Sequence, residues 1–280
     1  MDRFVKKRKR ETDDEEVEVT GVKGETLTKL SPGTSKDENR SGLGHSGGTV
    51  LSKALKWRQY SAEGLDCTYT ILYNKTEADD LMSACEKSLE YYTGQTTKVF
   101  VFGKWHNIPR KQAAYGDAGL SYSYSGNSVD AKPWTPLLEN IRDRVSKETG
   151  YTYNFVLVNR YKDGHDHMGE HRDDERELIP GHPIASLSLG QPRNFVFKHA
   201  KSRGKNATKK IAPVTIKLGH GSLLMMNHPT NTHWYHSLPQ QKSLVGVRIN
   251  MTFRKIDPSK MAPGKKRTRP AIEAPIASSH

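Results

Sequence analysis

Two residues near the middle of the chain, His171 and Asp173, have side chains that bind metal ions and a spacing that suits one shared site. Side chains two residues apart on an extended segment point to the same side, so both can reach a single ion. A further histidine would complete a face of two imidazoles and one carboxylate. Such a face suits non-haem Fe(II), because it leaves positions open for a co-substrate and O₂.

The chain contains 12 histidines, so the third ligand has several candidates. We favour His236, which lies in a short aromatic run that is predicted to be a strand. The competing residues are His165, His167, His228 and His233. Spacing alone also allows a zinc site of three neighbouring histidines: His165, His167 and His171.

The last predicted strand, residues 245–256, has two chemically different faces. One face is apolar, and the other alternates with it and carries polar side chains: Arg248, Asn250, Thr252 and Arg254. Two guanidinium groups, an amide and a hydroxyl suit a dicarboxylate, because guanidinium forks pair with carboxylates. The alternative is the solvated face of an edge strand.

The elements that must position these residues follow from periodicity. Helical spacing is expected over 77–92, with Thr76 as N-cap, and over 136–145. The predicted strands are 68–73, 98–102, 154–161, 184–189, 194–199, 211–218, 221–226, 234–238 and 245–256. Helices followed by many short strands predict an α+β, mainly β fold, with a two-sheet sandwich buttressed by the helices.

Composition points to a polyanionic partner and to tails around one core. The net charge is +13, and Lys and Arg contacts to phosphates release counterions. Only 34% of residues are hydrophobic, and residues 1–55 and 258–280 are predicted to be disordered. Two cysteines without metal-type spacing fit a reducing compartment. No apolar run approaches the roughly 18 residues that span a bilayer, so we expect no membrane association.

The combination of motifs resembles the AlkB family of Fe(II)/2-oxoglutarate dioxygenases, and within it the nuclear branch that repairs duplex DNA in animals. The resemblance covers about residues 57–256. The segments that carry it are 102–106, 109–112, 115–119, 159–164, 169–178 and 225–236. It implies a double-stranded β-helix (jelly-roll) core with a nucleotide-recognition lid, formed by residues 56–257.

The resemblance also implies roles for the residues already singled out. His171, Asp173 and His236 would bind iron. The 2-oxoglutarate site would consist of Asn159, Tyr161, Arg248, Asn250, Thr252 and Arg254. With O₂, such a site hydroxylates an N-alkyl carbon on a base such as 1-methyladenine or 3-methylcytosine, and the product releases an aldehyde.

A DNA substrate requires residues that extrude the base and hold it. Val101, Phe102 and Gly103 at a hairpin tip would supply an apolar wedge, with Lys104 beside it, although alternation alone makes Phe102 a core residue. Tyr122 and Tyr124 would form the base pocket; the family usually has Phe at position 124. Asp174 and Glu175 adjoin the iron ligands. An Asp174 carboxylate would attract a cationic base, or instead pair with Arg254 or another arginine. The phosphate contacts would come from Arg110, Lys198 and Lys205.

The N-terminal tail carries two short basic motifs. Residues 6–10 are all Lys or Arg and predict nuclear localisation. Residues Arg3 to Lys7 resemble a motif that binds the replication sliding clamp, with Lys6 in place of the second aliphatic residue. We assume a monomer. The alternative functions are the same chemistry on RNA or single strands, and a nucleic-acid-binding protein with structural zinc and no turnover.

Overall fold

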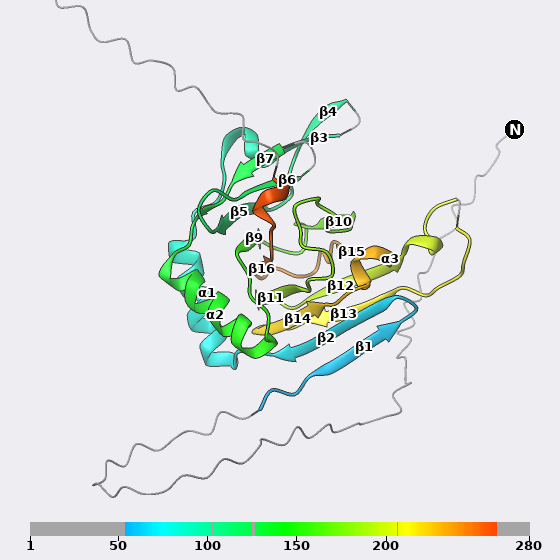
Figure 1. Ribbon diagram of the computed structural model, residues 1–280, viewed down its shortest axis with the longest axis horizontal. Coiled ribbons are helices and arrows are strands. Elements are labelled where there is room, and N and C mark those ends of the chain that lie inside the picture. Colours follow the sequence, from blue (N-terminus) through cyan, green and yellow to red (C-terminus); the bar gives the residue numbers. More distant parts are fainter. Residues whose placement is uncertain (1–53, 102, 125–126, 206, 262–280) are drawn as a thin grey trace, which may run out of the picture. The chain divides into compact units, whose positions relative to one another are not determined.

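The computed structural model describes residues 54–101, 103–124, 127–205 and 207–261. Its larger sheet has eight strands in the order β1-β2-β14-β11-β16-β9-β5-β8 (Figure 1). These strands are β1 (Arg58–Ala62), β2 (Leu65–Ile71), β14 (Ser222–Met226), β11 (Ile184–Gly190), β16 (Arg248–Arg254), β9 (Phe155–Tyr161), β5 (Lys111–Gly116) and β8 (Lys132–Pro133). All neighbouring pairs are antiparallel except β5 and β8.

A second sheet of four strands faces the inner side of the first. Its order is β10-β15-β12-β13. The strands are β10 (Met168–His171), β15 (Trp234–Leu238), β12 (Arg193–His199) and β13 (Val214–Leu218). Buried side chains from both sheets, such as Leu224 and Phe197, form one apolar cluster between them. Two facing antiparallel sheets confirm the predicted jelly-roll core.

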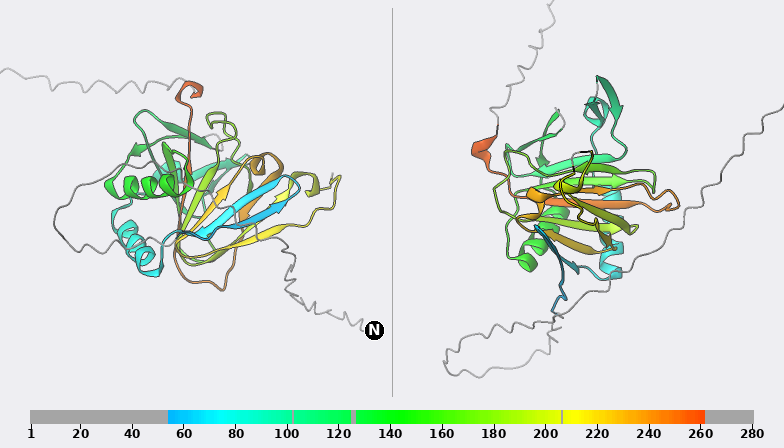
Figure 2. Two further views of the ribbon diagram at one scale, coloured as in Figure 1. Left: turned by 60° about the horizontal axis from the view of Figure 1, so that its bottom comes forward. Right: turned by 90° about the vertical axis from the view of Figure 1, so that its right-hand side faces the viewer.

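Two helices cover the outer face of the larger sheet, α1 (Lys75–Ser88) and α2 (Pro136–Thr149) (Figures 1 and 2). The apolar stripe of α2 places Leu138, Ile141 and Val145 against the sheet, where they are fully buried. Burial of each such side chain contributes about 1.5–3 kcal/mol. The helices thereby hold the sheet from behind and leave its inner face for polar residues.

The predicted N-cap of α1 was wrong by two residues. Asn74, not Thr76, caps the helix, because its side chain accepts a hydrogen bond from the Glu77 amide and the Glu77 carboxylate accepts one from the Asn74 amide. This reciprocal pair satisfies two amides that the first helical turn leaves free. The helix also ends earlier than predicted, at Ser88.

Two hairpins stand apart from the main sheets (Figure 1). One joins β3 (Lys98–Val101) to β4 (Lys104–Asn107), and the other joins β6 (Ser121–Tyr124) to β7 (Asn127–Asp130). Short helical turns complete the fold: η1 (Gly94–Thr97), η2 (Ala200–Ser202), α3 (Thr230–His233) and η3 (Pro258–Lys260). The pairing of Val101 with Lys104 puts Gly103 at the turn of this hairpin, and Phe102, predicted at the same tip, lies outside the described residues. Gly103 has φ +75°, a conformation that glycine adopts without strain.

Several boundaries differ from the prediction. The strand expected at 211–218 begins at Val214, after Pro213, and the last strand is shorter, Arg248–Arg254. At the C-terminal side, the described structure runs to Met261 and includes η3, beyond the predicted boundary at 257. The tails at 1–53 and 262–280 lie outside the described residues. Among the helices that the structure describes, none has the length and apolar character needed to cross a membrane.

Candidate active site

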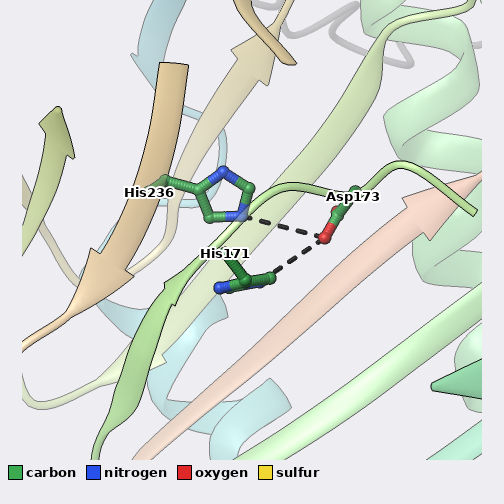
Figure 3. A group of neighbouring side chains, drawn as sticks. All are labelled: His171, Asp173 and His236. Atoms are coloured by element: carbon green, nitrogen blue, oxygen red, sulfur yellow. Dashed lines mark ion pairs between the residues drawn. The ribbon is translucent and has the colours of Figure 1, made fainter. Parts of the chain in front are cut away.

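The strand register brings the proposed metal ligands together from two segments of the chain. His171 at the end of β10 lies directly opposite His236 on β15, and their ring centroids are 4.3 Å apart. Asp173 follows β10 by two residues and turns its carboxylate to the same side. Its Oδ1 atom lies 3.5 Å from Nε2 of His171 and 3.8 Å from Nε2 of His236 (Figure 3).

Burial and charge keep Asp173 ionised and His236 neutral, the forms of these side chains that bind a metal. Burial alone would raise the pKa of Asp173, but the Arg254 guanidinium, 2.7 Å away, holds it well below the usual value. Burial lowers the pKa of His236 to about 3, so its ring is neutral near pH 7. Burial also disfavours the charged form of His171, but the Asp173 carboxylate outweighs burial and raises the pKa of that imidazole.

The donor set fits a metal ion. One donor atom from each of the three side chains lies within 4.8 Å of the others. Two imidazoles and a carboxylate on one side of an ion leave the opposite side open, which is the arrangement that suits Fe(II). His236 is 3% exposed, and its Nδ1 atom has no hydrogen-bond partner within the described structure.

The competing histidines do not join this group. In the described part of the chain, no second set of three metal-binding side chains meets the same distance limit. His165 is exposed, with its ring Nδ1 3.5 Å from Asp163. His167 directs Nδ1 at the carbonyl of His165, 3.0 Å away, and His233 stacks on His199. The alternative zinc site was therefore wrong.

The inner face of the larger sheet forms the polar floor of a cavity of about 840 Å³ beside these ligands. Strand β16 lies between β11 and β9 at the centre of the sheet, so the edge-strand alternative was wrong. Its apolar residues Ile249, Met251 and Phe253 pack towards the helices. Its polar residues line the cavity, as alternation predicted: Arg248, Asn250, Thr252 and Arg254.

Hydroxyl groups on β11 orient the floor residues. Arg248 donates from Nη2 to Oγ of Ser188 at 2.9 Å, and Asn250 donates to Oγ of Ser186 at 2.9 Å. The Arg248 guanidinium lies 5.3 Å from the ring centroid of Tyr161. Burial lowers the pKa of Arg248 to about 10, so the side chain remains a cation near pH 7. Two buried arginines lining one cavity favour a ligand with two carboxylates.

Asn159 is held from the other side, by residues of β5 and of the segment before it. Its Oδ1 atom accepts from Nε of Arg110 at 2.8 Å and from Nε2 of Gln112 at 3.0 Å. Because the oxygen of the Asn159 amide faces these two donors, its NH₂ group points away from Arg110 and Gln112. Arg110, expected at a phosphate, instead points into the cavity and also donates to the carbonyl of His167 at 3.3 Å.

Sequence reasoning missed two residues of the cavity wall, Gln112 and Ser186, and a third residue, Ser188, that supports Arg248. All three are buried polar residues. The two serines interrupt the apolar run of β11 at alternate positions, which is a signal that the sequence contained. Gln112 had a weaker signal, because β5 was not among the predicted strands.

The predicted DNA-binding residues fall into two groups. Lys104 and Lys205 are exposed, and Lys198 is partly exposed. Asp174 and Glu175 line the cavity. Asp174 is 71% exposed and lies 3.7 Å from Arg172, whereas Arg254 pairs with Asp173, so Asp174 pairs with another arginine, as one form of the prediction had it, and not with Arg254.

Four residues of the predicted wedge and base pocket lie wholly or partly outside the described structure. Phe102 lies outside the described residues. The backbones of Val101, Tyr122 and Tyr124 lie in strands β3 and β6, as predicted, and their side chains are not described. Their roles at the base therefore stay predictions.

Comparison with known proteins gives a consistent family. The model of the 2OG-Fe(II) oxygenase superfamily matches residues 67–254. DNA oxidative demethylase ALKBH2 of Homo sapiens is 57% identical over 242 residues, which cover 86% of this chain and 92% of that protein. The Mus musculus protein of the same name is 60% identical over 208 residues, covering 74% and 87%.

More distant similarity supports the fold. Alpha-ketoglutarate-dependent dioxygenase alkB homolog 3 of Homo sapiens is 36% identical over 152 residues, 54% of this chain and 52% of that protein. A solved structure titled "The structure of OsALKBH1" superposes with a TM-score of 0.50 at 16% identity, covering 71% of this chain and all of that one.

Replacing Asp173 by Asn should abolish metal binding, because it removes the anionic ligand and leaves Arg254 as a buried cation without its carboxylate. Titration calorimetry with Mn(II) should show at least a hundredfold loss of affinity, roughly 3 kcal/mol. As the matched control, Asp163→Asn changes another acidic residue in the loop before β10 and should bind Mn(II) like the unmodified protein. Equal Mn(II) affinity of Asp173→Asn and Asp163→Asn would contradict the assigned metal site.

Proposed function

The chain belongs to the AlkB family within the 2OG-Fe(II) oxygenase superfamily, and from this we propose that it is a DNA oxidative demethylase using Fe(II), 2-oxoglutarate and O₂. One structural observation supports this proposal above all: His171, Asp173 and His236 converge beside a cavity floored by two buried arginines. Relatives named for DNA demethylation match over most of their length, which supports the same reaction here.

The three converging side chains would hold the iron, and the polar floor would hold 2-oxoglutarate. When bound, iron with 2-oxoglutarate and O₂ supplies the oxidising power that hydroxylates an N-alkyl carbon. Arg248, fixed by Ser188, and Arg254, fixed by Asp173, would bind the two carboxylates of the co-substrate. Asn159 would present its NH₂ group to the same ligand, because its oxygen already accepts two hydrogen bonds.

The substrate would be an alkylated base extruded from the stack. Tyr122 and Tyr124 would stack on it, with His171 as the opposite wall. The acidic residues Asp174 and Glu175 line the cavity and would favour cationic bases such as 1-methyladenine and 3-methylcytosine. The aldehyde then leaves with the alkyl carbon, and the base is restored.

Duplex DNA is the form of substrate that the hairpin favours. An enzyme acting on a paired base must fill the gap that the base leaves, and apolar side chains serve this purpose in other proteins. The predicted wedge is Val101, Phe102 and Gly103; of these, Val101 ends β3, and Val99 on the same strand lines the cavity. Lys104, Lys198 and Lys205 would contact phosphates. The same chemistry on RNA or single strands is the second candidate.

The N-terminal tail would direct the enzyme to its substrate. We propose nuclear action, supported by the basic residues 6–10 and by relatives named for DNA demethylation. Residues Arg3 to Lys7 would bind the replication sliding clamp, which would bring the enzyme to replicating DNA.

The first test is turnover. Incubation with a duplex oligonucleotide containing 1-methyladenine, Fe(II), ascorbate and 2-oxoglutarate should release formaldehyde and succinate in equal amounts. The Asp173→Asn protein should release neither. If the unmodified protein produced no formaldehyde on any methylated DNA, the proposed function would fail.

The second test separates duplex from single-stranded substrates. Phe102→Ala should lower kcat/KM on the methylated duplex by about tenfold or more, because unstacking costs a few kcal/mol per step without a wedge. The loss on the single strand should be much smaller. Ile71→Ala, which shortens an exposed apolar residue on β2, serves as the control and should affect neither. Equal losses on both substrates would argue for the single-stranded alternative.

The third test addresses the tail in cells with the full chain carrying a fluorescent tag. Alanine at residues 6–10 should abolish nuclear accumulation. Phe4→Ala should leave nuclear accumulation intact and remove co-localisation with replication sites. Nuclear accumulation of the first variant would contradict the localisation motif, and unchanged co-localisation of the second would contradict clamp binding.

A further inference from the structure

Strand β10 has an outer face that the proposed reaction does not use. His171 points towards the metal site, so the side chain of Glu170, its neighbour in the strand, lies on the other side, although the residue also borders the active-site cavity. The Glu170 carboxylate contacts two cations, one near the end of β12 and one in the loop that follows it: Oε1 lies 2.5 Å from Nζ of Lys198, and Oε2 lies 2.8 Å from Nε of Arg203. One carboxylate therefore holds two basic groups of the region expected to face DNA.

A second contact fixes the arginine independently of this carboxylate. The Arg203 guanidinium lies 3.6 Å from the ring centroid of Tyr235 on β15, and Arg172 lies 4.7 Å from the centroid of the same ring. Cation–π contacts of this kind hold a guanidinium in place without using its hydrogen-bond donors. Arg203 would thus keep its position if its anionic partner were exchanged.

We propose that Glu170 is an internal substitute for a DNA phosphate, occupying a phosphate site made by Lys198 and Arg203 until nucleic acid displaces it. This inference rests on the proposed function, because it requires a DNA substrate. A phosphodiester group carries one negative charge and two free oxygens, as a carboxylate does, so it can take over both contacts. We call the Glu170–Lys198–Arg203 cluster the acidic latch.

The surroundings of the acidic latch suit such an exchange. A pocket of about 570 Å³ lies at the cluster and is lined by Glu170, Lys198, Ser202, Arg203, Gly204, Ile211 and Pro213. The paired side chains are 28%, 43% and 31% exposed for Glu170, Lys198 and Arg203. Exposed ion pairs are weak, so a phosphate can compete with the carboxylate.

The consequence is a lower affinity for DNA in general. In the free protein the single charge of Glu170 offsets one of the two positive charges that would otherwise attract a phosphate backbone, and release of Lys198 and Arg203 costs their two contacts to Glu170. Binding of undamaged DNA, which rests on phosphate contacts alone, bears this cost without compensation from a base in the cavity. The acidic latch would therefore favour dissociation from undamaged sites.

The test compares Glu170→Gln with Glu86→Gln in the full chain. Both remove one negative charge from a pair with a basic residue; Glu86 pairs with Arg160, whose strand position lies between cavity-lining residues Asn159 and Tyr161. Fluorescence anisotropy with an unmodified duplex should show Glu170→Gln binding about three- to tenfold tighter at low salt, on the order of one phosphate contact. The gain should shrink as salt rises, and Glu86→Gln should bind like the unmodified protein.

The role of the released cation is tested by Arg203→Gln in two backgrounds. It should weaken DNA binding more in Glu170→Gln than in the otherwise unmodified chain, where the carboxylate already occupies Arg203. Thermal unfolding and Mn(II) binding report whether each variant is folded. If the Glu170→Gln protein is not folded, Glu170→Asp is used in its place, because the shorter side chain cannot keep the contacts to both Lys198 and Arg203.

The outcomes separate the two proposals. If Glu170→Gln and Glu86→Gln bind DNA equally, or Glu170→Gln binds more weakly, the acidic latch is overturned, while demethylation by the unmodified protein can stand. If the unmodified protein neither binds nor demethylates DNA, the proposed function itself fails.

Discussion

The buried ion pair between Asp173 and Arg254 is the interaction on which the site depends. Both side chains are 3% exposed, and their closest atoms are 2.7 Å apart. A carboxylate this deeply buried would take up a proton without a partner, and a protonated Asp173 would be a poor metal ligand. Loss of one partner of such a pair costs about 3–5 kcal/mol. The same arginine lines the co-substrate cavity, so one contact joins the two binding functions.

The pairing register of the strands positions the other residues of the site. His171 and His236 meet because β10 and β15 pair directly, and the polar residues of β16 face inward because the apolar ones pack under α1 and α2. A shift of one residue in β16 would turn the arginines into the helix-covered core. The helices therefore fix the chemistry of the cavity from the opposite face of the sheet, without contributing to its lining.

Local pattern was enough to predict the alternation on β16 and the pairing of His171 with Asp173, because both depend on spacing within short segments. Prediction from local pattern failed where the position or orientation of a residue depends on a specific partner in the folded structure. The cap of α1 was misplaced because Thr76 and Asn74 are both good caps, and only the reciprocal bond with Glu77 favours Asn74. The orientation of Arg110 was not predictable, since it depends on Asn159, 49 residues away. Choosing His236 over four other histidines likewise required the family resemblance or the fold.

Strand β10 shows how a period of two lets one short segment serve two purposes. Its inward residue belongs to the metal site, and its outward neighbour Glu170 holds Lys198 of β12 and Arg203 of the loop that follows. The separation is geometric: adjacent residues of a strand point to opposite faces, so their partners never compete. It also means that an event at the loop is one peptide unit from a metal ligand. A group that pulled Glu170 away from Lys198 would act on the strand that carries His171, so the proposed exchange with a phosphate would have a short physical connection to the metal site.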